Sequence, residues 1–294
     1  MSQEEKNRVE GGVLYLVATP IGNLADLSER AKKVLSEVDF IAAEDTRNTI
    51  KLLSVFGIRK PCVSYFEHNK RRRGEEILER IENGEACALV TDAGTPAISD
   101  PGEDIVRLAA EKGIRVTSIP GCCAAVNALA LSALATGRFA FEGFLSANKG
   151  ERRKQIEALK DEPRTMILYE APHKLRDTLC DLAAVFSDRK ISLCRELTKL
   201  NEEILRMTVS EAVTFYEEKE PRGEYVLVLE GAEEHYGADY KRTTADTSLL
   251  SLSPEAHVAH YEKEGLSRMD ATKKAASDRG MTKSELYKIL NYGK

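Results

Sequence analysis

The chain has no tryptophan but is otherwise ordinary for a globular protein, and its 294 residues are enough to bury two cores. It also lacks an apolar run long enough to cross a bilayer, because its longest stretch of small apolar residues, 124–135, is interrupted by Asn127 and Ser132. The polar first ten residues contain no apolar segment of the kind that a signal peptide needs. These absences argue against a membrane or secreted protein, and we expect a cytoplasmic one with no membrane partner.

Metal-binding patterns are missing as well. The six cysteines form no CxxC pair and no cluster with zinc-ligand spacing. Most of them lie in apolar runs, where a free cysteine behaves as a small hydrophobic residue. His257 and His260 are one helical turn apart, but no further histidine or cysteine lies near them in sequence. We therefore predict no metal site.

Net charge does not select a class of partner. The chain has 43 Lys and Arg against 48 Asp and Glu, a formal charge of -5. An acidic protein can still bind nucleic acid through local basic patches, so the distribution of charge matters more than its sum.

The order of apolar patterns predicts an α/β protein in several parts. Over 12–138, strand-like runs alternate with helical patterns, which is typical of a mostly parallel sheet covered on both faces. Over 139–231, helices are fewer and strands are neighbours, which indicates a mixed sheet. Residues 232–253 are polar and turn-rich and are predicted to be a linker. Residues 254–294 predict a small tail of three helices, the third opened by a capping box at 282–285. This tail resembles a helix-turn-helix, although a dimerisation or packing appendage is a nearly equal alternative.

Unusual residues gather in the turns that follow the predicted strands. The most informative is VTDAGTPAISDPG at 90–102, where glycine allows close backbone approach to a ligand and proline stiffens the loop. Similar turns are TPIGN at 19–23, EDTR at 44–47 and PGCC at 120–123. The carboxyl ends of parallel strands share one edge of a sheet, so the four turns should line one crevice. Turns after strands of the second unit, at 170–173 and 195–199, should face the same ligand.

These motifs carry a family resemblance. VATPIGN, AEDTR, VTDAGTPAISDPG, PGCCA, YEAPHKL, CRELTK and GEYVLVLEG follow one another between Leu14 and Gly231. In this order they resemble the ribosomal RNA small subunit methyltransferase I group of the tetrapyrrole methylase superfamily, and the tail is similar to that group's C-terminal extension. The resemblance implies a two-domain α/β fold, S-adenosylmethionine as methyl donor and a homodimer. It also implies 2'-O-methylation of a cytidine in the decoding region of 16S ribosomal RNA, within the small ribosomal subunit.

The resemblance places the donor between the two domains, without the glycine-rich dinucleotide fingerprint. Many superfamily members have aspartate where this chain has Thr95. Together, the loop and the resemblance predict donor contacts at Ile21, Gly22, Asp92, Gly94, Thr95, Ile98, Gly121, Cys122, Ala171, Leu197 and Tyr225.

The chemistry defines what the catalytic residues must do. A sulfonium methyl is already activated, so the enzyme mainly aligns it with the attacking oxygen. The ribose hydroxyl needs a general base, for which Glu44, Asp45 and Glu170 are the preferred strand-end candidates. Arg47 would hold a phosphate or orient a carboxylate. Each carboxylate could equally cap a helix or form a structural ion pair.

Two basic runs, taken as loops beside the cleft, are the candidates for contact with RNA phosphates. They are Lys70, Arg71, Arg72, Arg73 and Lys149, Arg152, Arg153, Lys154. A solvated surface is the alternative interpretation. Tyr65, Phe66 or Tyr169 could stack on the target base. Two other functions stay open, namely methylation of a porphyrin precursor at carbon and a non-catalytic RNA-binding role.

Overall fold

The computed structural model describes residues 8–232, 249, 252–279 and 281–292. The chain divides into two compact units, Met1–Gly231 and Ala232–Lys294. No helix in these described ranges is both long and apolar enough to cross a membrane.

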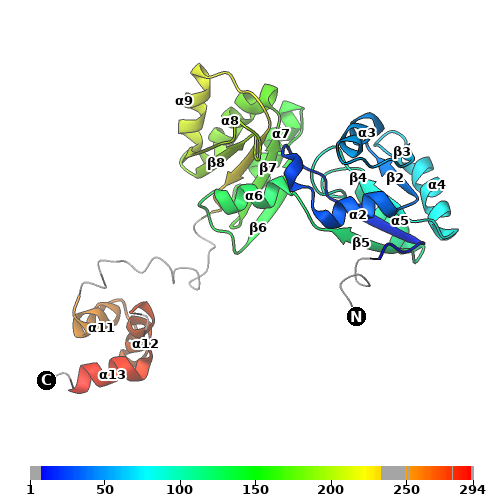
Figure 1. Ribbon diagram of the computed structural model, residues 1–294. Coiled ribbons are helices and arrows are strands. Elements are labelled where there is room, and N and C mark those ends of the chain that lie inside the picture. The colour runs from blue at the N-terminus through cyan, green and yellow to red at the C-terminus, as the bar shows by residue number, and fades with distance from the viewer. Residues whose placement is uncertain (1–7, 233–248, 250–251, 280, 293–294) are drawn as a thin grey trace. The chain divides into compact units, whose positions relative to one another are not determined.

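The first half of the larger unit is a parallel sheet covered on both faces, as the sequence predicts. Its strands run in the order β3-β2-β4-β1-β5 and are all parallel. Alternate residues of β1 belong to cores on opposite faces of the sheet. Tyr15 is in the core that α2 and α3 cover, and Leu14 is in the core that α4 and α5 cover. Figure 1 shows this half in colours from blue through cyan to the green of β5. The strands are β1 (Val13–Val17), β2 (Phe40–Ala43), β3 (Cys62–Ser64), β4 (Cys87–Val90) and β5 (Arg115–Ile119), and the helices are η1 (Leu24–Asp26), α2 (Glu29–Glu37), α3 (Thr46–Val55), α4 (Lys70–Glu82) and α5 (Gly102–Glu111).

The second half is a mixed sheet, also as predicted. The strand order is β6-β7-β10-β8-β9, and only β6 and β7 are parallel. Three helices, α7, α8 and α9, supply the core on one face. The strands are β6 (Phe139–Phe144), β7 (Thr165–Glu170), β8 (Lys190–Arg195), β9 (Glu203–Thr208) and β10 (Tyr225–Leu229), and the helices are α7 (Lys149–Ala158), α8 (Pro172–Phe186) and α9 (Val209–Glu218).

The helix that covers the other face of the second sheet comes from the first half of the sequence. Helix α6 (Ala124–Leu131) falls within 12–138, yet Ala125, Ala128 and Leu129 pack against Ile167 and Val228 of the second sheet. By packing, α6 therefore belongs to the second sheet, which ties the two halves into one unit.

The two basic runs are helical, which corrects their assignment to loops. Lys70–Arg73 form the first turn of α4, and Lys149–Lys154 begin α7 after the Asn148 cap. Most of the polar residues that suggested a loop are exposed or partly exposed on these helices, and Arg152 is the buried exception.

The tail folds as the three predicted helices, α11 (Pro254–Lys263), α12 (Arg268–Asp278) and α13 (Lys283–Tyr292). Val258, Tyr261, Ala271 and Leu286 are among the residues of its own core. The predicted capping box is confirmed, since the Thr282 N–H donates to the Glu285 carboxylate at 2.7 Å. The predicted linker, 232–253, lies mostly outside the described residues.

Candidate active site

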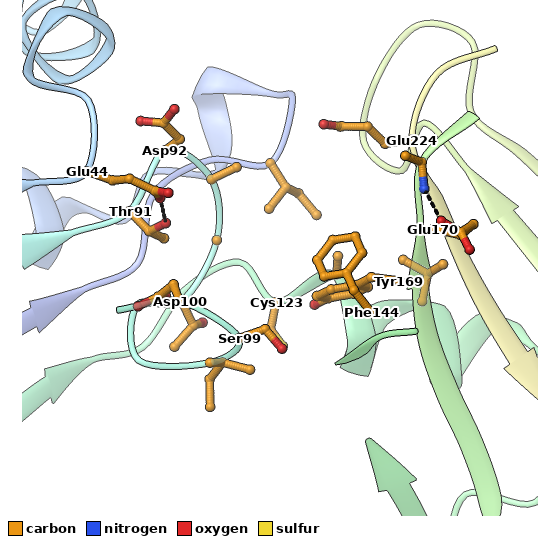
Figure 2. Close-up of a pocket in the computed structure, with 18 of the residues that line it drawn as sticks. Glu44, Thr91, Asp92, Ser99, Asp100, Cys123, Phe144, Tyr169, Glu170 and Glu224 are labelled. Atoms are coloured by element: carbon orange, nitrogen blue, oxygen red, sulfur yellow. Dashed lines mark hydrogen bonds between the residues drawn. The ribbon is translucent and has the colours of Figure 1, made fainter. Parts of the chain in front are cut away.

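A cavity of about 860 Å³ lies where the strand-end turns of the two sheets meet. Its size is within the range of roughly 300–1,000 Å³ that is usual for ligand pockets. Figure 2 shows Glu44, Thr91 and Asp92 on one side and Tyr169, Glu170 and Glu224 on the other. The predicted crevice is thus present and is lined by both halves of the larger unit.

The loop after β4 forms one wall and is held in an unusual conformation. Gly94 has φ +85° and exchanges backbone hydrogen bonds with Thr19 at 2.9 and 3.1 Å. Ala97 and Ser99 are also left-handed, with φ of 68° and 59°, which is uncommon for residues other than glycine. Such strain persists only where surrounding contacts impose it, and it tends to occur at functional sites.

Asp100 holds this loop in place. Its Oδ1 accepts hydrogen bonds from the N–H groups of Ala97 at 3.0 Å and Gly102 at 2.6 Å. The other oxygen, Oδ2, is buried and has no partner among the described residues. Burial raises the pKa of the Asp100 carboxyl, and the backbone donors oppose that rise. We infer that Asp100 shapes the wall of the cavity.

The facing wall repeats this pattern in the loop after β8. Glu196 and Thr198 are left-handed, with φ of 53° and 68°. The Glu196 Oε1 accepts from the Lys199 ammonium at 2.9 Å and from the Glu224 N–H at 3.0 Å. Burial raises the pKa of Glu196, but these donors outweigh it and hold that pKa below its usual value. A Cβ at Gly22 would lie 2.3 Å from the Lys199 Cγ, so only glycine lets the first turn pack against this wall.

Aromatic side chains line the end of the cavity near β6 and β7. The Tyr169 ring packs edge-on against Phe141 at 5.1 Å, and its hydroxyl accepts from the Ala125 N–H at 3.3 Å. Phe144, whose ring lies 5.4 Å from that of Tyr169, lines the cavity and is 57% exposed. Sequence reasoning missed Phe144, because its strand was judged by its apolar pattern alone. Tyr65, by contrast, is buried and donates to the Pro101 carbonyl at 3.0 Å, so it cannot stack on a base.

Charge in the cavity is mostly negative, which favours a ligand with positive charge. Apolar side chains such as Ile21, Ile98 and Leu197 lie between the charged groups. The lining carboxylates are Glu44, Glu67, Asp92, Asp100, Glu103, Asp104, Glu170, Glu196 and Glu224, and the lining cations are Lys70 and Lys199.

Most of the predicted donor contacts line this cavity, namely Ile21, Asp92, Gly94, Thr95, Ile98, Ala171, Leu197 and Tyr225. Gly22, Gly121 and Cys122 are not among its lining residues, although Gly22 lines a smaller neighbouring cavity. Gly121 is required by packing, since a Cβ there would lie 2.8 Å from the Ala18 Cβ. The Cys122 carbonyl accepts from the Thr95 hydroxyl at 2.9 Å, and the neighbouring Cys123 lines the cavity instead.

Two of the four predicted catalytic residues line the cavity. Glu44 accepts a hydrogen bond from the Thr91 hydroxyl at 2.9 Å (Figure 2). Glu170 is buried, and its two oxygens accept from the Ala171 N–H at 2.8 Å and the Thr178 hydroxyl at 2.5 Å. Because both of its oxygens are engaged, the geometry favours a structural role for Glu170.

Asp45 and Arg47 lie outside the lining of the large cavity. Asp45 is the N-cap of α3 and accepts from the Arg47 N–H at 2.8 Å. The Arg47 guanidinium is 2.7 Å from the other carboxylate oxygen, and this pairing lowers the pKa of Asp45 to about 2. The structure therefore favours the capping alternative for Asp45, with Arg47 orienting its carboxylate.

The basic runs contain one clear exception to the RNA-contact prediction. Arg152 is buried and its guanidinium is 2.7 Å from the Asp181 carboxylate, so it cannot reach a phosphate. Asp181 also pairs with Arg153 at 2.8 Å, but the Arg153 side chain is 60% exposed. The burial of Arg152 follows from its place on the inner face of α7, which a loop assignment could not predict.

The other residues of the runs are accessible to different degrees. Lys70 pairs with Glu67 and Asp104 at 2.8 and 2.6 Å, which raises its pKa. Arg72 and Arg73 pair with Glu76. Arg71, Lys149 and Lys154 are exposed and form no ion pair with a described residue.

Comparison with known proteins supplies a family for this fold and site. The family model described as Tetrapyrrole (Corrin/Porphyrin) Methylases matches residues 13–213. A relative from Halalkalibacterium halodurans, Ribosomal RNA small subunit methyltransferase I, is 47% identical over 98% of both chains. The protein of the same name from Bacillus subtilis is 46% identical over 94% of this chain and 93% of its own.

Among solved structures, a uroporphyrin-III C-methyl transferase from Thermus thermophilus complexed with S-adenyl homocysteine matches with a TM-score of 0.53. Its identity is 15%, and the match covers 74% of this chain and 96% of that one. At this identity the similarity shows the fold alone, which in this chain consists of a parallel first sheet and a mixed second sheet.

Proposed function

Because this chain belongs to the tetrapyrrole methylases, and within them to the ribosomal RNA small subunit methyltransferase I family, we propose that it methylates 16S ribosomal RNA. The proposed reaction transfers the methyl group of S-adenosylmethionine to the 2'-oxygen of a cytidine ribose in the decoding region. The observation that carries the proposal is the cavity between the two sheets, in a chain that matches these relatives over nearly its whole length.

The lining of the cavity fits the methyl donor. S-adenosylmethionine carries a sulfonium and an ammonium, and the surplus of carboxylates favours both. Ile98 and Leu197, from opposite walls, supply apolar surface for the adenosine. The backbone at Gly94 comes close to the cavity because no side chain intervenes. When bound, the donor supplies an activated methyl group, and the protein holds it in line with the acceptor.

Among the predicted catalytic residues, the proposal retains Glu44. It is the one whose carboxylate lines the cavity with a single hydrogen bond, to Thr91, and therefore keeps acceptor capacity. A carboxylate there would serve either as general base, a type of catalysis worth roughly 10²–10⁴-fold in rate, or as negative charge beside the sulfonium of the donor.

The two basic runs support RNA as the acceptor. Four cations begin α4, where the positive end of the helix dipole disfavours cations. The helix dipole therefore does not explain Lys70–Arg73. Ion pairs with Glu67, Glu76 and Asp104 offset part of this cost, and phosphate binding would engage the helix end and the side chains together. The proposed phosphate contacts are Lys70, Arg71, Arg72, Arg73, Lys149, Arg153 and Lys154.

The proposal extends to assembly and location. We propose that the protein is a cytoplasmic homodimer that acts on RNA within the small ribosomal subunit. Light scattering coupled to size-exclusion chromatography measures the dimer directly, and a monomer mass at working concentration would contradict it.

The decisive experiment is mass mapping of 16S ribosomal RNA from a strain that lacks this gene. We expect one cytidine nucleotide to lose about 14 Da, the mass that replacing a hydrogen by a methyl group adds, and to regain it on complementation. Methylation of a porphyrin precursor by the purified protein, with unchanged RNA, would favour the second candidate. Isothermal titration with the donor tests the non-catalytic alternative, which requires no binding.

A further inference from the structure

A second, smaller cavity lies next to the one described above. Its volume is about 200 Å³, and it shares two lining residues, Thr91 and Asp92, with the large cavity. Its other walls come from the first turn and η1 on one side and from α3 on the other. The two cavities are thus neighbours along the loop that follows β4.

The small cavity has both apolar and polar walls. Pro20, Leu24 and Leu52 supply apolar surface, while Asn48 and Asp92 supply hydrogen-bonding groups. Its volume is below the roughly 300–1,000 Å³ of drug-sized ligand pockets, so it suits one fragment of a larger ligand. A sugar ring has this character, with apolar faces and hydroxyl groups at its edge.

Asp92 supplies the one carboxylate that lines both cavities. Its Oδ2 accepts a hydrogen bond from the Asn48 amide at 3.1 Å. This single bond fixes the direction of the carboxylate and leaves Oδ1 with acceptor capacity. Asp92 is exposed, so a hydroxyl entering from the small cavity can reach it.

We propose that the small cavity receives the acceptor ribose and that Asp92, oriented by Asn48, is the general base. This inference rests on the proposed function and adds to it the acceptor subsite and a base. As the ribose oxygen bonds to the methyl carbon, the carbon–sulfur bond breaks and the positive sulfonium becomes a neutral thioether. The hydroxyl proton passes to Asp92 Oδ1 and then to solvent, so atoms and charge balance.

The position of Asp92 distinguishes it from Glu44. Glu44 lines only the large cavity, where its carboxylate faces the Thr91 hydroxyl. Asp92 lines both cavities, and an acceptor in one must meet a donor in the other at their shared wall. On this geometry Glu44 contributes negative charge near the donor, and Asp92 meets the proton.

The test compares Asp92→Asn and Glu44→Gln in the full-length protein with small ribosomal subunits as substrate. We expect Asp92→Asn to lower the single-turnover rate by about 10²–10⁴-fold, the usual effect of losing a general base. Because Asp92 also lines the large cavity, donor affinity, measured by titration calorimetry, should fall far less than the rate. The rise of the wild-type rate with pH should vanish in Asp92→Asn and persist in Glu44→Gln.

A third variant tests the subsite itself. Leu24 is 46% exposed, so Leu24→Trp can narrow the small cavity without disturbing the core. We expect it to raise the KM for the subunit and to leave donor affinity unchanged. Glu111→Gln, which changes an exposed carboxylate on α5 that pairs with Arg107, is the matched control and should behave as wild type.

Several results would overturn the inference. One is an Asp92→Asn variant with the wild-type rate and pH profile, and another is loss of the pH-dependent rise in Glu44→Gln instead. Weakened donor binding in Asp92→Asn, with a rate restored at saturating donor, would make Asp92 a donor contact. If the wild-type protein transfers no methyl group to the subunit, the proposed function itself is wrong, and this result is distinguished from failure of the inference about Asp92.

Discussion

Single residues in the strand-end turns have distinct tasks that their chemical types alone do not reveal. Gly94 and Asp45 both lie directly beyond strands of the parallel sheet, and both belong to motifs that the family resemblance picks out. Gly94 lines the large cavity with a left-handed backbone, whereas Asp45 caps a helix outside that lining. Substitutions at these two positions should therefore separate ligand binding from stability.

Replacing Gly94 should remove donor binding. In Gly94→Val the first added carbon would lie 3.4 Å from the Ile21 Cγ2, and the branched side chain would crowd the backbone that lines the cavity. Gly113→Val is a matched control, because Gly113 has φ +71° and nothing within 4 Å of an added Cβ. Both variants should lose stability through the disfavoured backbone, but only Gly94→Val should lose calorimetric donor binding. Equal affinities in the two variants would contradict a donor site at Gly94.

Replacing Asp45 should affect stability and not turnover. Asp45→Ala removes the N-cap of α3 and should lower the melting temperature, whereas asparagine is itself a good cap and should preserve it. Since pairing with Arg47 lowers the folded pKa of Asp45 from 3.8 to about 2, its contribution is present above pH 3.8 and is lost as pH falls toward 2. Reduced turnover per folded molecule in both variants would instead support the catalytic interpretation.

At the scale of elements, the first turns of α4 and α7 determine which basic side chains are exposed and can contact RNA phosphates. A salt titration of RNA binding measures how many phosphates they neutralise. Replacing Lys149 and Lys154 by glutamine should lower the slope of log affinity against log salt by roughly 0.7–0.9 for each phosphate that the variant no longer neutralises. Arg152→Gln should leave the slope unchanged and destabilise the fold, by at most about 3–5 kcal/mol because Arg153 still pairs with Asp181. An unchanged slope in the variant that lacks Lys149 and Lys154 would make these lysines ordinary surface.

The helical tail should lose stability as the solution becomes mildly acidic. His257 is fully buried, and its Nδ1 accepts from the Arg279 guanidinium at 3.0 Å. Burial and the Arg279 charge lower the pKa of His257. Above pH 6.5, the usual pKa of histidine, His257 is neutral in both the folded and the unfolded state. Below pH 6.5 it is protonated first in the unfolded state, so the free energy of unfolding falls. The hydrogen-exchange protection factors across α11–α13, which are corrected for the pH dependence of intrinsic exchange, should fall below about pH 6.5, and His257→Asn should flatten that dependence.

At the scale of the whole larger unit, the cavity exists only because two sheets face one another. Ile98 lies on the loop after β4, and Leu197 lies on the loop after β8. Ile98→Ala and Leu197→Ala should therefore each weaken donor binding, with a smaller loss of stability for the more exposed Ile98. A loss confined to one variant, measured by calorimetry, would place the donor on one half of the unit.

The sequence by itself determined the order of elements and the chemistry of the turns. Apolar periodicity predicted the parallel and mixed sheets, because strands buried on two faces and amphipathic helices leave local signatures. Turn residues predicted the crevice, because parallel strands bring their carboxyl ends to one edge. Serine is a favoured N-cap residue, and the Ser28 hydroxyl at the start of α2 accepts from the Ala31 N–H at 3.1 Å.

Tertiary structure alone decided which side chains face the cavity. Successive residues after a strand point in different directions, so Cys123 rather than Cys122 lines it. Arg152 is buried because Asp181, distant in sequence, lies on the helix that α7 packs against. The assignment of α6 to the second sheet, and the wall shared by two cavities at Asp92, likewise arise from contacts between distant segments. Local sequence patterns do not predict such contacts, because the contacts form only when distant elements pack together.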